Sequence, residues 1–220
     1  MSTFRMLAEM SLSTLFGIAV LSFRAMTTSR VTAEEFRPIK EAEMPRGFPG
    51  YTAVGQIELK KYPAYRKASV SGGGAFWTLF RHIQQNKIEM TAPVEMDYGD
   101  ASAERSAERS MSFLYDAPER GTAGKQGRVE VIDVPAMTVA SIGYRGSQTA
   151  AAVDDARRKL LGYLAERRNE YSVAGPMRVM GYNSPFVPRY KNFFEVQVPV
   201  KAAKADQLKV PSARQKAETK

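Results

Sequence analysis

Apolar and polar residues alternate in several short segments of this chain, a pattern typical of strands that are buried on one face. Ile57–Val70 and Val129–Ile142 align without a gap, and each predicts a strand, a bend at a proline and a second extended stretch. Five aligned positions hold identical residues: Glu58/Glu130, Pro63/Pro135, Ala64/Ala136, Ala68/Ala140 and Ser69/Ser141. The chain therefore contains a predicted internal repeat, with copies at about 56–118 and 128–200.

A stretch with helical periodicity follows each of these segments. After Gly72–Gly74, the segment Ala75–Asn86 has apolar residues at i, i+3, i+4 and i+7. These residues are Phe76, Leu79, Phe80 and Ile83. After Gly146 we expect a longer helix at about 148–169, with Ser147 as its N-cap.

Two more strands are expected after each helix, at Lys87–Met96 and Ser110–Asp116 and then at Met177–Tyr182 and Phe193–Val200. Every second residue of the first of these is apolar from Ile88 onward, so we expect one face of it to be buried. Neither half can cover its own sheet face. We therefore expect an α+β domain in which duplicated β-α-β-β units form an antiparallel, barrel-like sheet flanked by two helices. A cleft where a helix crosses the sheet is the expected ligand site.

Composition excludes several kinds of chemistry. The chain has no cysteine, which excludes disulfides, thiolate catalysis, Cys-ligated metals and covalent haem attachment through cysteine. Its one histidine, His82, excludes a multi-histidine metal site. Of the net charge of +9, residues 1–30 contribute +2 and residues 201–220 contribute +4, which leaves +3 for the rest. We therefore expect no nucleic-acid partner, and a basic, disordered tail at 201–220.

The N-terminal region contains an apolar run, Ser11–Phe23, between Arg5 and Arg24. It is shorter than the ~20 apolar residues of a transmembrane helix and is closer to the core of a signal peptide. We therefore interpret residues 1–30 as a signal-like or anchor-like leader. Export or membrane attachment through residues 11–23 is favoured over a soluble or organelle-targeting leader. Residues 31–50 are expected to be a linker, or an arm laid on a domain at 51–200.

Several segments, in this order, resemble the SOUL haem-binding protein family: KKYPAYRKA, AFWTLFRHIQQNKIEMTAPVEM, MSFLYDAP and GYNSPFVPRYKNFFEVQVPV. The strongest is Lys87–Val94, KIEMTAPV, because the family is marked by a K-I-x-M-T-x-P-V motif after its first helix. The resemblance covers about residues 50–200. It implies a duplicated αβ barrel flanked by two helices, a fold shared with bacterial effector-binding domains. It also implies reversible, non-covalent binding of haem or a related tetrapyrrole, for carriage, buffering or signalling, without enzymatic turnover.

Haem is a flat apolar disc with two propionates, so its site needs apolar walls, one or two cations and, optionally, an axial ligand. The candidate cofactor-binding residues are Trp77, Phe80, Arg81, His82, Met90, Tyr182, Arg189 and Lys191. His82 is the candidate axial metal ligand because it is the only imidazole. On a helical wheel it lies at the flank of the buried face, where we expect partial accessibility, and a boundary residue without a ligand is the alternative.

The other candidates each have a second interpretation. A guanidinium suits a planar carboxylate, so the candidates for pairing with propionates are Arg81, Arg189 and Lys191. The alternative is that they are solvated surface charges. Trp77, Phe80 and Met90 are candidate cleft walls, or they pack the helix against the sheet. Tyr182 begins a loop-rich segment, and such loops often form the rim of a site.

Two other functions stay open at this stage. One is an effector-binding module for other small aromatic or cationic ligands, which acidic residues facing the cleft would favour. The other is a hydrolase that uses Glu195 as a general base. Glu195 alternates with Phe194 and Val196, so it faces away from them, either into the cleft or toward solvent. No nucleophile–base spacing is present, so the sequence predicts no enzymatic activity, and it predicts no oligomeric state.

Overall fold

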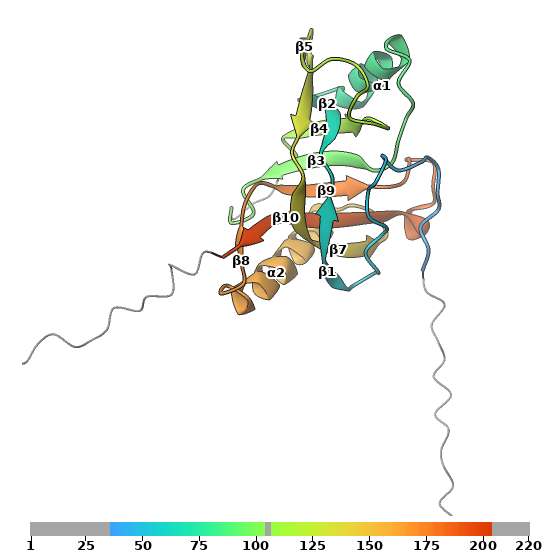
Figure 1. Cartoon of the computed structure of the whole chain (residues 1–220). Helices are drawn as coiled ribbons and strands as arrows, with labels where there is room; N and C mark the ends of the chain where they lie inside the picture. Colours follow the sequence, from blue (N-terminus) through green and yellow to red (C-terminus); the bar gives the residue numbers. More distant parts are fainter. Residues whose placement is uncertain (1–35, 104–106, 204–220) are drawn as a thin grey trace, which may run out of the picture. The chain divides into compact units, whose positions relative to one another are not determined.

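A computed structural model describes residues 36–103 and 107–203, and Figure 1 shows their helices and strands. The elements are β1 (Ile57–Tyr62), β2 (Tyr65–Ser71), α1 (Ala75–Gln85), β3 (Val94–Gly99), β4 (Ser110–Leu114), β5 (Gly124–Gln126), β6 (Val129–Val134), β7 (Met137–Arg145), α2 (Ala150–Glu166), β8 (Tyr171–Val173), β9 (Met177–Gly181), the 3-10 turn η1 (Arg189–Lys191) and β10 (Phe193–Ala202). The predicted α+β class is confirmed. The predicted leader at 1–30, and all but the start of the predicted tail, lie outside the described residues.

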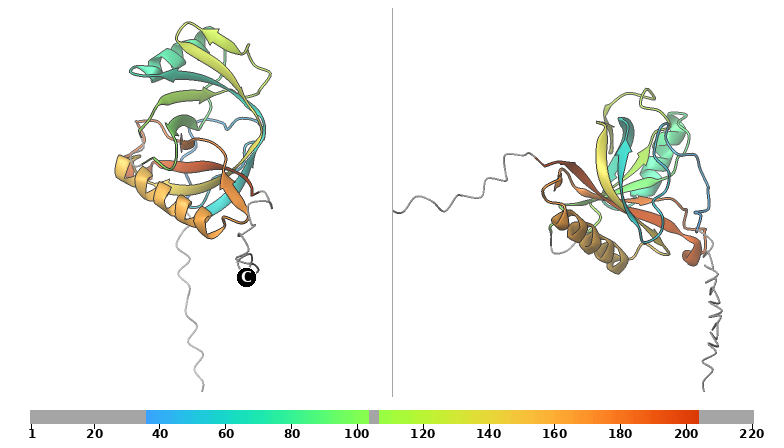
Figure 2. Two further views of the ribbon diagram at one scale, coloured as in Figure 1. Left: turned by 90° about the vertical axis from the view of Figure 1, so that its left-hand side faces the viewer. Right: turned by 60° about the horizontal axis from the view of Figure 1, so that its bottom comes forward.

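The strands form one antiparallel sheet, which is open and not closed into a barrel (Figure 2). They are hydrogen-bonded in the order β1-β7-β10-β9-β3-β4-β2-β6-β5, and β8 pairs with β10 off this path. The path has two ends. These ends are β1 and β5, and no pairing joins them among the described residues. The expected barrel-like sheet is corrected in this respect.

The two similar segments of the sequence pair with each other. β1 lies against β7 and β2 against β6, and the register is continuous across the proline bend of each segment. Glu58 pairs with Ser141, and the residues aligned with them in the other segment, Glu130 and Ser69, pair with each other. The pairing is therefore unchanged when the two segments are exchanged. The two paired segments form one bent, two-stranded ribbon, with β1 and β7 at one end and β2 and β6 at the other. This ribbon joins the two halves of the sheet.

Both helices pack on the same face of the sheet. Val94 is in register with Phe113 and Gly181, and Gly181 is in register with Phe194, so these residues share that face. The cluster under α1 contains Ala68, Val70, Ala75, Leu79, Ile83, Ile88, Phe113, Tyr115, Val129 and Val131. The cluster under α2 includes Ala140, Ile142, Val153, Ala156, Leu160, Leu164, Val179, Phe194, Val196 and Val198. The predicted helical stripe of α1 is therefore buried at Leu79 and Ile83.

Residues 36–52 form an arm that crosses the opposite face of the sheet. The ring of Phe48 contacts Tyr62 and Tyr65 edge-on, with centroids 4.9 and 5.2 Å apart. The backbone of the arm comes very close to the sheet at Gly143, where a Cβ atom would lie 2.3 Å from the carbonyl oxygen of Thr52. Only a glycine permits this approach. The arm therefore covers the face that the helices leave open.

Two local predictions are wrong. The strand expected at Lys87–Met96 begins only at Val94, because Lys87 has a left-handed φ of 53° and residues 88–93 lead from α1 to the sheet. Ile88, Thr91 and Pro93 are the buried residues of this segment, so its burial does not follow the alternation of a strand. The N-cap of α2 is Thr149 and not Ser147, since the Thr149 hydroxyl accepts from the Ala152 amide at 3.2 Å.

Candidate functional site

The eight candidate residues fall into two separate groups. Phe80 and Met90 pack against the cluster under α1, whereas Tyr182 belongs to the cluster under the arm. Arg189 and Lys191 are exposed on η1, at the start of β10. Between the two groups, the described part of the chain shows no hydrogen bond, ion pair or ring contact. The structure therefore offers no single site lined by all eight residues.

The first group contains an aromatic face on α1. Trp77 is 67 % exposed, the largest apolar surface that this helix leaves in solvent. Its ring contacts Phe76 and Phe80 edge-on, at centroid distances of 5.3 and 6.0 Å, and those two rings are stacked at 6.1 Å. Arg81 is exposed one turn further along the helix. We call Phe76, Trp77, Phe80 and Arg81 the α1 aromatic face.

His82 is buried, which corrects the expected partial accessibility. It is 7 % exposed, and its Nε2 lies 2.7 Å from the hydroxyl of Tyr115. The amide of Asn86 lies 3.4 Å from Nδ1. Burial lowers the pKa of His82, which favours the neutral imidazole. A neutral imidazole can bind a metal, but this nitrogen is occupied by Tyr115 and points away from solvent. Within the described residues, no group of three His, Asp or Glu side chains could hold a metal ion.

The second group does not form the rim of an open site. Tyr182 is 4 % exposed, and its ring packs against Tyr51 of the arm at 4.9 Å and against Phe193 at 5.4 Å. It is therefore a core residue, which corrects its expected place on a loop rim. Arg189 and Lys191 remain in solvent.

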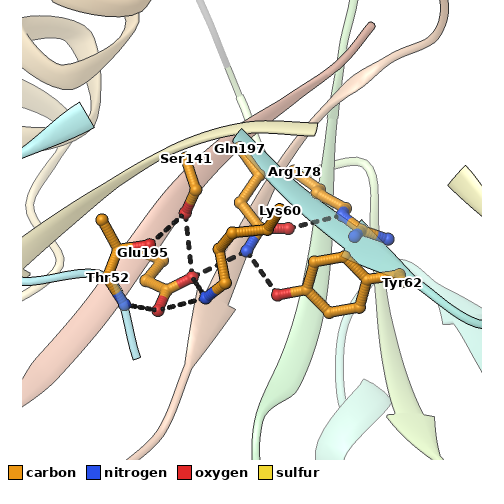
Figure 3. A network of polar contacts seen from close by, with 7 residues as sticks. All are labelled: Thr52, Lys60, Tyr62, Ser141, Arg178, Glu195 and Gln197. Atoms are coloured by element: carbon orange, nitrogen blue, oxygen red, sulfur yellow. Dashed lines mark hydrogen bonds and ion pairs between the residues drawn. The ribbon is translucent and has the colours of Figure 1, made fainter. Parts of the chain in front are cut away.

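A network of buried polar side chains lies under the arm, on the face away from the helices (Figure 3). Glu195 of β10 is at its centre and is fully buried. Its carboxylate accepts from Lys60 Nζ at 3.0 and 2.9 Å and from the Thr52 backbone amide at 2.7 Å. The Ser141 hydroxyl donates at 2.9 Å and the Gln197 amide at 2.7 Å. Glu195 is therefore fully engaged within the protein, and no surface of it is available to act as a general base.

A second buried carboxylate, Glu95 of β3, completes the network. The Tyr65 hydroxyl donates to it at 2.7 Å, Arg178 Nη1 donates at 3.3 Å, and Lys67 forms an ion pair with it. Burial by itself raises the pKa of Glu95, but the charges of Arg178 and Lys67 and the hydrogen bonds outweigh it and lower the pKa below its ordinary value. Arg178 Nε also donates to Gln197 at 3.0 Å, which links the two carboxylates.

In this network the positive charges outnumber the negative charges. Two carboxylates are matched by three cations, Lys60, Lys67 and Arg178. One donor, Arg178 Nη2, has no partner among the described residues. This face of the sheet therefore does not provide the acidic cleft that would favour cationic ligands. The network instead connects six strands of the sheet, β1, β2, β3, β7, β9 and β10, and the arm. Such connections favour one arrangement of a core over its alternatives.

Sequence reasoning did not identify Lys60, Glu95 or Arg178. Glu95 and Arg178 each stand in a strand between two apolar residues, which was the only local signal available, whereas Lys60 stands between Leu59 and Lys61 and carries no such signal. Their convergence depends on β1, β3 and β9, which are far apart in the chain but close together in the sheet.

Two cavities lie away from the α1 aromatic face. One, of about 320 Å³, is lined by Phe36, Arg37, Pro38, Lys40, Tyr51, Thr52, Ala53 and Phe193. The other, of about 460 Å³, is mostly polar and is lined by Ser71, Asp97, Gly99, Asp100, Arg109, Ser110, Gly175 and Pro176. Both volumes lie near the small end of the usual range for ligand pockets. Neither cavity has a residue of α1 or His82 in its wall.

A comparison with models of protein families identifies the family of this chain. The model of the SOUL haem-binding protein family matches residues 48–199, which include the whole sheet up to β10 and both helices. The chain therefore belongs to the SOUL haem-binding protein family. A search of curated proteins found no match.

Solved structures share the fold. EcmrR in a complex with DNA matches with a TM-score of 0.51 and 18 % identity, over 66 % of this chain and 57 % of that chain. This chain thus spans little more than half the length of EcmrR. The C-terminal domain of EcmrR has a TM-score of 0.47 and 18 % identity, over 66 % and 97 % of the two chains. A hydrolase from Listeria innocua has a TM-score of 0.47 and 13 % identity, over 69 % and 94 %. At these identities the likeness is one of fold alone.

Proposed function

We propose that the chain binds haem or a related tetrapyrrole reversibly and without a covalent bond, on the α1 aromatic face, as a carrier, buffer or sensor and not as an enzyme. The family supports the ligand class. The observation that carries the site is the exposed Trp77, with two aromatic rings beside it and a guanidinium one turn away. A flat apolar macrocycle would cover these rings, and Arg81 would pair with a propionate.

Ligation of the iron by His82 is a separate question. A bound haem would supply the spectroscopic and redox properties of its iron, which a nitrogen ligand changes. For His82 to serve as that ligand, its Nε2 must first leave the Tyr115 hydroxyl. On a helix, His82 and Trp77 are five residues apart, so they point in different directions. We therefore propose that the stacked macrocycle binds without His82.

The binding site is tested by titrating the purified chain with hemin and following the Soret band. We expect a saturable shift in the wild-type chain and about tenfold weaker binding in Trp77→Ala, because an aromatic contact and its buried area are lost. Phe186→Ala is the matched control, since it removes an exposed ring elsewhere. Equal hemin affinity in the wild type and Trp77→Ala would refute the proposed site. The absence of a saturable shift in the wild type would refute the proposed function.

The role of His82 is tested with two variants. Tyr115→Phe removes the hydroxyl that holds Nε2, and His82→Ala removes the imidazole. We expect both variants to give the wild-type Soret position when saturated. A shift in His82→Ala, or tighter binding in Tyr115→Phe, would show that His82 ligates the iron and would contradict this part of the proposal.

The alternative functions have less support. An effector-binding module for cationic ligands would need an uncompensated acidic group under the arm, where cations outnumber carboxylates. A hydrolase would need an accessible Glu195. We also propose that residues 11–23 attach the chain to a membrane or direct its export. Neither described helix is long and apolar enough to cross a bilayer.

A further inference from the structure

The loop after β9 and the turn η1 expose two aromatic side chains to solvent. Phe186 is 94 % exposed and Tyr190 is 62 % exposed, in the segment Asn183–Lys191. Pro185 and Pro188 stand on either side of Phe186 and restrict the backbone there. Full exposure of a phenylalanine is costly in water. A loop of this kind is typical of a surface that contacts something else.

The start of the arm lies directly beside this loop (Figure 1). Asn183 donates to the Ile39 carbonyl at 2.8 Å, and Ser184 binds the Glu41 carboxylate through its amide at 2.6 Å and its hydroxyl at 2.7 Å. Ile39 is itself 39 % exposed. Three of the six large apolar side chains exposed in the described chain are therefore gathered here. We call residues 36–41, 183–191 and Arg145 the arm–loop surface.

The arm–loop surface is also basic. Its cations are exposed, namely Arg37, Lys40, Arg145, Arg189 and Lys191. Arg145 bridges the two segments, because its Nε donates to the Tyr190 carbonyl at 2.7 Å and its guanidinium lies over the Phe36 ring at 4.8 Å. Glu41 is held by the loop, and Glu43, just outside the surface, pairs with Lys40 at 2.6 Å, which leaves four cations without a carboxylate at this place. The surface thus combines projecting rings with an excess of positive charge.

We propose that the arm–loop surface docks on an anionic phospholipid bilayer, with Phe186 and Tyr190 at the depth of the headgroups. Charge complementarity favours this occupant, because cations next to projecting apolar side chains suit an anionic membrane surface. The position of the arm also favours it. The described chain begins at Phe36, on this surface, and the apolar run Ser11–Phe23 lies only a short stretch upstream in the sequence. The inference does not depend on tetrapyrrole binding.

A single-tryptophan reporter tests whether the loop itself meets the lipid. Trp77 is the only tryptophan of the chain, so the double variant Trp77→Phe/Phe186→Trp of the full chain reports on the loop alone. With vesicles of phosphatidylcholine and phosphatidylserine, we expect its emission to shift to the blue and to be quenched by brominated lipid. The wild-type chain, which reports from α1, should show neither change. Unchanged emission of the double variant on vesicles that bind the chain would overturn the proposal, since residues 11–23 would then act alone.

Charge and ring variants test the energetics by vesicle sedimentation. Arg189→Gln/Lys191→Gln should lower partitioning into anionic vesicles about fivefold for each charge removed, and Phe186→Ser about tenfold. Arg158→Gln on α2 is the control for charge, because its side chain is 64 % exposed on another element. If all of these loop variants bound the vesicles as well as the wild type, the proposal would be contradicted. If Phe186→Ser instead dissociated a dimer and left vesicle binding unchanged, the occupant would be a second copy of the chain.

Discussion

The Lys60–Glu195 pair is the most consequential contact of the buried network, and Lys60→Met tests it. Both side chains are at most 3 % exposed, and Nζ contacts both carboxylate oxygens at 3.0 and 2.9 Å. Methionine fills similar volume without the charge. The variant leaves Glu195 with three hydrogen-bond donors and no adjacent cation. A buried carboxylate in that state is strongly disfavoured, because it has lost hydration without gaining a counter-charge.

The expected cost follows from that burial. Removing one partner of a buried ion pair typically destabilises a protein by about 3–5 kcal/mol, a large part of the roughly 5–15 kcal/mol that holds a domain folded. Glu195→Gln should cost a similar amount, since Lys60 is then unpaired. The double variant Lys60→Met/Glu195→Gln buries no unpaired charge and should be more stable than either single variant. The coupling energy should be about 3 kcal/mol or more.

The assay is urea unfolding at neutral pH, followed by far-ultraviolet circular dichroism, for the four members of this cycle. Lys61→Met is the control, because Lys61 is the next residue of β1 and is exposed. It should change the free energy of unfolding by less than about 0.5 kcal/mol. A Lys60→Met variant as stable as the control, or additive effects in the double variant, would show that the pair contributes little and would refute the reasoning.

Three further predictions concern the arm, α2 and His82. Gly143→Ala should destabilise the fold by at least about 2 kcal/mol in urea unfolding, because its Cβ would meet a backbone carbonyl of the arm, whereas Gly162→Ala in α2 meets nothing within 4 Å and should stabilise by about 0.5–1 kcal/mol. Thr149→Ala should cost about 1 kcal/mol through the lost N-cap, and Ser147→Ala should cost nothing measurable; equal costs would contradict the assignment. Burial lowers the pKa of His82, so the unfolded chain binds a proton more readily than the folded chain. The free energy of unfolding should therefore fall as the pH drops through the ordinary pKa of 6.5, and His82→Asn should reduce that slope.

Much of the local structure was predictable because it depends on neighbours in the chain. The alternation in the two similar segments predicts the strands on both sides of each proline, and the structure has β1, β2, β6 and β7 there. The apolar spacing predicts α1 within one residue of its end. Short strands such as β5 and β8 were missed, since three residues carry no periodicity.

The candidate site was predicted less well, and the reason is geometric. The helical wheel places His82 at the edge of the buried face, but Tyr115, the residue that follows β4, covers it. Alternation shows that Glu195 points away from Phe194 without showing what lies on that side. The arm closes that side through Thr52, and nothing within β10 encodes this contact.

The sequence by itself determined the alternation of the strands, the helical stripes, the absence of thiol chemistry and the likeness to a family of haem-binding proteins. Only the tertiary structure decided which charges meet. Lys60 on β1 and Glu195 on β10 are remote in the chain, but only β7 separates their strands in the sheet, Arg178 lies on the neighbouring β9, and the arm seals these residues from water. Local patterns reflect the burial of one face at a time, whereas an ion pair depends on the distance between two groups, which is set by the path of the whole chain.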